Sequence, residues 1–109
     1  MPILMFEEYV IKSDKLNEFG VFLKKYLVWL EKKRPILYKE VKSHKLLSQM
    51  FGGNFGKYIE IWEYDNLADC EKCLNRLMTD NELMTEIFPE YSSYFAPATH
   101  KMEIWNSET

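Results

Sequence analysis

Two side-chain periodicities alternate along the 109-residue chain, and the order in which they occur constrains the fold most. Alternation of apolar and polar residues predicts a strand, whereas apolar residues recurring every three or four positions predict a helix. Alternation is clearest over residues 57–64, where Ile59 and Ile61 point to one face. The opposite face carries Tyr58, Glu60, Trp62 and Tyr64. This segment therefore reads as a strand with two chemically different faces.

The longest helical pattern begins after Ser13 or Asp14, either of which can cap a helix, and reaches about Lys33. Pro35 is expected to stop the helix there, because proline lacks the backbone N–H that a helix interior needs. The apolar stripe of this helix consists of Leu16, Phe19, Leu23, Tyr26, Leu27 and Leu30, and it is widened by Phe22 and Trp29.

The remaining segments complete a strand-helix-strand-strand-helix-strand order. Predicted strands occupy residues 3–12, 36–51, 57–64 and 98–105, and the second helix runs from Asp65 or Asn66 to about Met78. The loop Gly52-Gly53-Asn54-Phe55-Gly56 predicts a hairpin, since glycine and asparagine tolerate positive φ. The run Thr79-Asp80-Asn81-Glu82 is a capping box that starts another helical piece, and Pro89 interrupts or restarts that piece.

Right-handed crossovers applied twice to this order give one α+β domain over residues 1–109, with a ferredoxin-like βαββαβ topology. The four-stranded antiparallel sheet has the order 4-1-3-2, and both helices lie on one face. We expect the other face to carry the aromatic side of residues 57–64, and large aromatics rarely stay in water. The predicted cover is a second copy of the chain, with Tyr58, Glu60, Trp62 and Tyr64 at the homodimer interface.

Composition excludes several classes of function. The net charge is −3 and the cations are dispersed, so neither nucleic acid nor a charged membrane surface is an expected partner. No apolar run approaches the roughly 18 residues of a membrane span, and the first residues do not resemble a signal peptide. Two cysteines are too few for a disulfide framework. The expected location is the cytoplasm.

The glycine hairpin followed by Glu60-Ile61-Trp62-Glu63-Tyr64-Asp65-Asn66-Leu67-Ala68-Asp69 resembles the end of the third strand in NIPSNAP-like small proteins. The whole layout is similar to the dimeric α/β-barrel superfamily, in which two ferredoxin-like subunits pack sheet against sheet. This resemblance implies a homodimer. It leaves function open, because that superfamily includes cofactor-free monooxygenases, isomerases, haem-handling enzymes and small-ligand sensors.

Two motifs suggest chemistry but are better explained as structural. Cys70 and Cys73 form a CxxC near a helix start, yet neighbouring acids oppose a thiolate, and a second pair for zinc is missing. His44 and His100 are predicted on the two outer strands, about 14 Å apart at ~4.8 Å per strand spacing. They cannot share a metal within one subunit, although sharing across a dimer stays open. We expect no metal site and no cofactor.

His100, Glu7 and Glu60 are the candidate catalytic residues. His100 shares parity with Met102 and Ile104, so it should face the helices as a general base, a haem ligand or a hydrogen-bonded structural histidine. Glu7 and Glu60 should face the partner subunit as partly buried acids with raised pKa values. They would act as a general base, bind a cation, or form hydrogen bonds and ion pairs across the dimer.

Three functions remain open at this stage. The first is binding of a small hydrophobic or aromatic molecule between sheet and helices by a homodimer. The second is a cofactor-free monooxygenase or isomerase, and the third is a haem-binding or haem-degrading protein. The expected ligand site lies near His100 and Met102, with Phe22 and Trp29 of the first helix above it.

Overall fold

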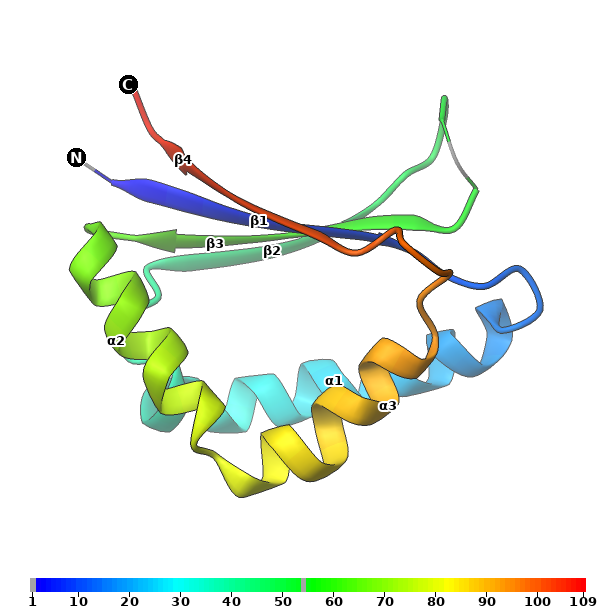
Figure 1. Ribbon diagram of the computed structural model, residues 1–109, viewed down its shortest axis with the longest axis horizontal. Helices are drawn as coiled ribbons and strands as arrows, with labels where there is room; N and C mark the ends of the chain where they lie inside the picture. Colours follow the sequence, from blue (N-terminus) through cyan, green and yellow to red (C-terminus); the bar gives the residue numbers. More distant parts are fainter. Residues whose placement is uncertain (1, 54) are drawn as a thin grey trace.

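A computed structural model describes residues 2–53 and 55–109. It contains a four-stranded antiparallel sheet in the order β2-β3-β1-β4, with the helices on one face (Figure 1). The predicted ferredoxin-like fold and strand order are thereby confirmed. In chain order, the elements are β1 (Ile3–Val10), α1 (Leu16–Leu37), β2 (Ser43–Ser48), β3 (Lys57–Tyr64), α2 (Leu67–Met78), the π-helical turn η1 (Leu83–Ile87), α3 (Phe88–Ser93) and β4 (Lys101–Asn106).

Strand β1 is one of the two central strands of the sheet, and it pairs with β3 on one side and β4 on the other. In this register, Glu7 stands opposite Glu60 on one side and Met102 on the other. Directly opposed residues of an antiparallel pair point to the same face. A row of two carboxylates and a thioether therefore crosses the middle of the sheet, on the face that the helices cover.

The aromatic face of β3 packs against the helices, which corrects the predicted dimer interface. Glu60, Trp62 and Tyr64 are buried in the core, and Tyr58 packs against it at partial burial. The alternation along β3 was read correctly, but its two faces were assigned the wrong way round. Trp62 and Tyr64 oppose Met5 and Ile3 of β1, and all four side chains are buried in the core beneath the helices. The free face of the sheet carries the isoleucines of β3 instead.

Several element ends differ from the prediction. Helix α1 continues through Pro35 to Leu37, since a proline in the last turn costs little more than one hydrogen bond. The segment 36–42 is therefore helix end and loop, and β2 is shorter than predicted. The capping residue of the piece after α2 is Asp80, whose Oδ2 accepts from the Leu83 N–H at 2.9 Å, rather than Thr79.

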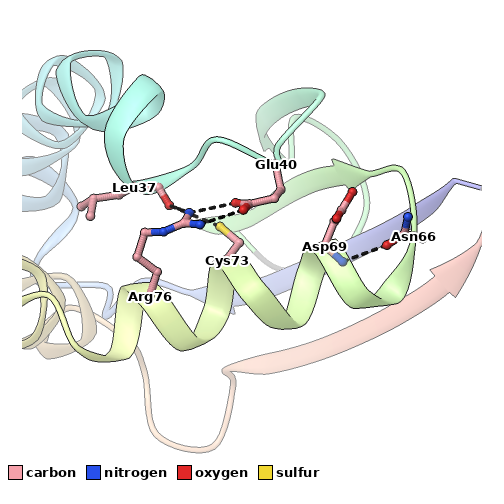
Figure 2. Close-up of polar contacts among 6 residues, drawn as sticks. All are labelled: Leu37, Glu40, Asn66, Asp69, Cys73 and Arg76. Carbon is pink, nitrogen blue, oxygen red and sulfur yellow. Dashed lines mark hydrogen bonds and ion pairs between the residues drawn. The ribbon is translucent and has the colours of Figure 1, made fainter.

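The β2–β3 connection contains glycines with positive φ, as expected of a hairpin. Gly56 has a φ of 85°, a conformation that L side chains rarely adopt, and its carbonyl accepts from the Ile11 N–H at 2.9 Å. Asn54, which the pattern also assigned to this turn, lies outside the described residues. At the other end of β3, Asn66 caps α2 by accepting from the Asp69 N–H at 2.8 Å (Figure 2).

Helix α2 is tied to the end of α1 by polar contacts around Arg76 (Figure 2). Its guanidinium donates to both carboxylate oxygens of Glu40, at 2.8 and 2.7 Å, and to the Leu37 carbonyl at 2.9 Å. Cys70 and Cys73 lie on the buried face of the same helix, and burial raises the pKa of both thiols. Both cysteines are buried, and this environment disfavours a thiolate.

Within the described part of the chain, no helix has the length and apolar character needed to cross a membrane.

Candidate functional site

The site is built around the carboxylate of Glu60, which is only 1% exposed. Tyr26 of α1 donates its hydroxyl to Oε2 at 2.8 Å, and Tyr91 of α3 lies within hydrogen-bond distance of Oε1 at 3.2 Å. His44 of the edge strand β2 forms the shortest contact, with Nε2 at 2.6 Å from Oε2. Three elements that are distant in sequence thus converge on one acid.

Burial raises the pKa of Glu60, and the nearby Glu7 adds to the effect, whereas the hydrogen bond from His44 acts in the opposite direction. Burial and the charge of Glu60 also raise the pKa values of Tyr26 and Tyr91. Both tyrosines are therefore neutral hydroxyl groups at ordinary pH. Tyr91 is also hydrogen-bonded to the hydroxyl of Tyr9, which extends the polar network across the core.

A second acid–histidine pair lies beside the first. The Nε2 atom of His100 is 3.0 Å from Oε2 of Glu7, and its ring contacts Phe95 at a centroid distance of 5.1 Å. The hydrogen bond with Glu7 raises the pKa of His100. Glu7 and Glu60 are directly opposed on neighbouring strands. The His44–Glu60 and Glu7–His100 pairs therefore lie in one row across the sheet, from β2 to the start of β4.

A cavity of about 140 Å³ lies between these acids and the helices. Its wall is mostly apolar and aromatic, with both carboxylates included. The lining residues are Met5, Glu7, Tyr26, Tyr38, Glu60, Trp62, Tyr64, Leu74, Leu77, Leu83, Phe88, Tyr91 and Met102. Small-molecule sites in proteins have this composition, an apolar pocket with a few convergent polar groups.

The structure brings some of the predicted site residues together and separates others. Met102 lines the cavity. Glu7 and Glu60 also line it, from the side of the sheet, although these two acids were predicted to face a partner subunit. His100 reaches the site only through Glu7 and is itself solvent-exposed. Phe22 and Trp29 are core residues that do not line this cavity, and Trp29 donates to Glu82 at 2.7 Å. Their roles in catalysis or binding stay predictions.

The partners of Glu60 could not be identified from the sequence. Tyr26 belongs to the apolar stripe of α1, where its hydroxyl carries no separate signal. Tyr91 follows an irregular π-helical turn, so its direction cannot be read from a helical period. The alternation along β2 places His44 on the same face as Trp62, but no sequence spacing relates His44 to Glu60.

Across residues 2–53 and 55–109, no group of three or more histidine, cysteine, aspartate or glutamate side chains is arranged to hold a metal ion. His44 and His100 pair with different glutamates, one at each side of the cavity. The chemistry that this arrangement offers is hydrogen bonding and proton transfer by carboxylates and imidazoles.

No family model matches the sequence, and no curated protein matches it. Solved structures do. A NIPSNAP-family protein from Agrobacterium tumefaciens superposes with a TM-score of 0.74 at 18% identity, covering 97% of this chain and 92% of that one. A dimeric protein of unknown function and ferredoxin-like fold from Bacteroides fragilis gives a TM-score of 0.70 at 12% identity, covering 97% and 96%.

A third structure is SnoaB, a cofactor-independent oxygenase from Streptomyces nogalater, with a TM-score of 0.67 at 8% identity and coverage of 99% and 94%. Identities this low show a common fold and nothing finer. The similarity to NIPSNAP-like proteins that the sequence indicated is confirmed at the level of the ferredoxin-like fold.

Proposed function

We propose that the protein is a homodimer that binds a small, largely apolar molecule with one polar group in the cavity between sheet and helices. The supporting observation is the cavity itself, which combines apolar walls with the buried carboxylate of Glu60. Its volume of about 140 Å³ resembles that of an engineered cavity of about 150 Å³ that binds benzene. A ligand with a single six-membered ring fits this size.

The lining also suggests how such a ligand would be oriented. Leu74, Leu77 and Leu83 supply an apolar side from the helices, whereas Glu7 and Glu60 lie at the sheet. A ring would contact the leucines and direct its polar group toward the acids. Burial of about one ring against apolar side chains contributes most of the affinity, and the polar contact determines orientation.

The free face of the sheet supports the homodimer. It carries Phe6, Ile59 and Trp105, which line a shallow apolar depression there. Glu8 on this face already forms ion pairs with Lys57 and Lys101, at 3.4 and 3.8 Å, so the charges around the depression are balanced. Such a self-neutral apolar face suits a second copy related by a two-fold axis. The dimeric protein from Bacteroides fragilis has the same fold.

A cofactor-free enzyme that moves a proton, such as an isomerase or monooxygenase, is the second candidate. The specific observation in its favour is the 2.6 Å contact between His44 and Glu60, because Glu60 lines the cavity and the two residues form an acid–base pair. No comparable observation favours haem binding. The cavity is far smaller than a porphyrin, and Nε2 of His100 is hydrogen-bonded to Glu7.

Ligand binding is tested by titrating the protein with toluene and with 4-methylphenol while following the methyl signal of Met102 and the indole signal of Trp62 by NMR. We expect dissociation constants below about 1 mM, equivalent to about −4.1 kcal/mol. Met102→Trp should fill the mouth of the cavity and weaken binding at least tenfold, about 1.4 kcal/mol.

Ile104→Trp is the matched control, because Ile104 lies two residues further along β4 and does not line the cavity. It should leave both affinities within about twofold, a difference below 0.5 kcal/mol. Absence of binding to the wild type, or equal losses in the two variants, would contradict the proposal.

A further inference from the structure

The indole N–H of Trp62 is a buried donor that finds no acceptor among the described residues. Trp62 is 4% exposed on β3, and its ring is stacked on Tyr38 at a centroid distance of 5.1 Å and contacts His44 at 4.1 Å. An indole nitrogen can only donate, and a buried donor without a partner is costly. Trp62 lines the central cavity and also the outer cavity beside His44, so its ring forms part of the wall between them. An oxygen of a molecule bound in the central cavity can supply the acceptor.

Glu60 offers the complementary group two residues earlier on the same strand and the same face. Its carboxylate oxygens accept hydrogen bonds, and it too lines the cavity. The wall therefore presents one donor with no partner and one buried acceptor on adjacent same-face positions. A hydroxyl group bound to a flat unsaturated carbon frame matches this combination, because a hydroxyl both donates and accepts.

We propose that the cavity binds a phenol or an enol, whose oxygen accepts from Trp62 Nε1 and whose hydroxyl proton is transferred to Glu60. This assignment rests on the proposed ligand-binding function and narrows it to one chemical class. In the transfer, the O–H bond of the ligand breaks, the proton moves to a carboxylate oxygen of Glu60, and the electron pair stays on the ligand oxygen. The step is a proton transfer alone and requires no oxidant or reductant.

The surroundings of Glu60 support its role as the base. The groups that face it are Glu7 from β1, His44 from β2, Tyr26 from α1 and Tyr91 from α3, with Tyr38 nearby. Burial raises the pKa of Glu60, which makes it a stronger base than an exposed glutamate. The hydroxyl of Tyr26 donates to the carboxylate, which favours the ionised form of Glu60 that accepts the proton.

His44 gives the transferred proton a route out of the core. Its Nε2 bonds Glu60, while the residue also lines a second cavity of about 140 Å³ on the outer side, between β2 and α1, together with Glu31 and Arg34. The histidine thus lies between the buried acid and a surface groove that carries charged side chains. An imidazole in this position can pass a proton from one side to the other.

The test uses 4-nitrophenol, because its phenolate absorbs visible light and its neutral form does not. It is added below the pH at which the free probe ionises, with toluene as a probe that lacks the hydroxyl. With the wild-type protein, we expect the bound probe to show the phenolate band and the Trp62 indole proton to shift downfield as it gains an acceptor.

Glu60→Gln should lower the phenolate fraction of the bound probe about tenfold, the equivalent of 1.4 kcal/mol. Trp62→Phe should weaken 4-nitrophenol binding by a similar factor of about ten, again 1.4 kcal/mol. Both variants should weaken toluene binding less than 4-nitrophenol binding, and a cooperative urea transition shows whether each variant is folded. Glu103→Gln and Trp105→Phe are the matched controls, since both residues line the depression on the opposite face and should change neither property.

The outcomes separate the two proposals. If the wild type does not bind toluene, the ligand-binding function itself is wrong. If toluene binds but bound 4-nitrophenol stays neutral, or keeps the same phenolate fraction in Glu60→Gln, the assignment to phenols and enols is wrong and the binding function stands. The wild-type spectrum alone decides this if either variant fails to fold.

Discussion

The carboxylate of Glu60 is unfavourable to bury in a small core, and it also lines the cavity. A carboxylate that is 1% exposed loses nearly all its hydration, and its retention requires the contacts from Tyr26, Tyr91 and His44. A hydrophobic residue at this position would pack against the same helices without that cost. The polar network therefore adds a cost to folding that an apolar side chain would avoid, which is consistent with the role proposed for Glu60 at the cavity.

This gives a prediction on the pH dependence of stability. The pKa of Glu60 is higher in the folded protein than its ordinary value of 4.5, so its contribution to stability is fully present below that pH and is lost as the pH rises through the folded pKa. The difference in unfolding free energy between wild type and Glu60→Gln should therefore shift against the wild type as pH increases. Urea denaturation between about pH 4 and pH 8 measures it.

The groups that face Glu60, which are Glu7, His44, Tyr26 and Tyr91, are present in both proteins, so the two curves differ only through the side chain at position 60 and its contacts with these groups. Glu103→Gln, at an exposed position of β4, serves as the control and should give a curve parallel to the wild type. Parallel curves for Glu60→Gln as well would show that the buried acid does not titrate in this range.

At the scale of elements, the roof over the cavity is assembled from α1, α2, η1 and α3, each of which contributes lining side chains. Helix α2 is joined to the end of α1 by the fork of Arg76, which reaches Glu40 and the Leu37 carbonyl (Figure 2). The side chains of Arg76 and Glu40 are 26% and 12% exposed, so this ion pair is partly shielded from water. Bidentate charged hydrogen bonds in such a setting contribute more than surface pairs.

Arg76→Ala should lower the free energy of unfolding by about 1–2 kcal/mol, because it leaves Glu40 without its partner and removes a donor from a helix end. Lys25→Ala is the comparison, since the Lys25–Glu90 pair at 3.0 Å is well exposed and should contribute little. Chemical denaturation of the two variants measures both effects. Equal losses in the two would show that the fork adds nothing beyond a surface ion pair.

For the whole molecule, the layout leaves one face of a four-stranded sheet without helices (Figure 1). That face carries Ile59 and Trp105, and beside them Glu8 forms ion pairs with Lys57 and Lys101. In the proposed dimer, a second copy placed there buries these side chains and leaves the cavity of each chain under its own helices. The two proposals, dimerisation and ligand binding, therefore concern different faces of the sheet and can be tested separately.

Ile59→Asp should convert the proposed dimer to a monomer, because two unpaired carboxylates would be buried across the two-fold axis. Val21→Asp is the control, since Val21 is 74% exposed on α1 on the helical side. Light scattering or sedimentation at micromolar concentration measures the assembly. A monomeric wild type, or a dimer that survives Ile59→Asp, would rule out this face as the interface.

The sequence by itself determined the order of elements, the parity along β3 and, with the crossover rule, the strand order. These features are local or follow from chain handedness, so Ile59 and Trp62 could be placed on opposite faces without any tertiary information.

Only the tertiary structure decided which face of β3 meets the helices, because parity leaves two equivalent answers. In the structure, Trp62 and Tyr64 are buried beneath the helices together with their β1 partners Met5 and Ile3. The surroundings of Glu60 are likewise tertiary. His44, Tyr26 and Tyr91 lie 16, 34 and 31 residues away from it, and no short-range period relates positions at such separations.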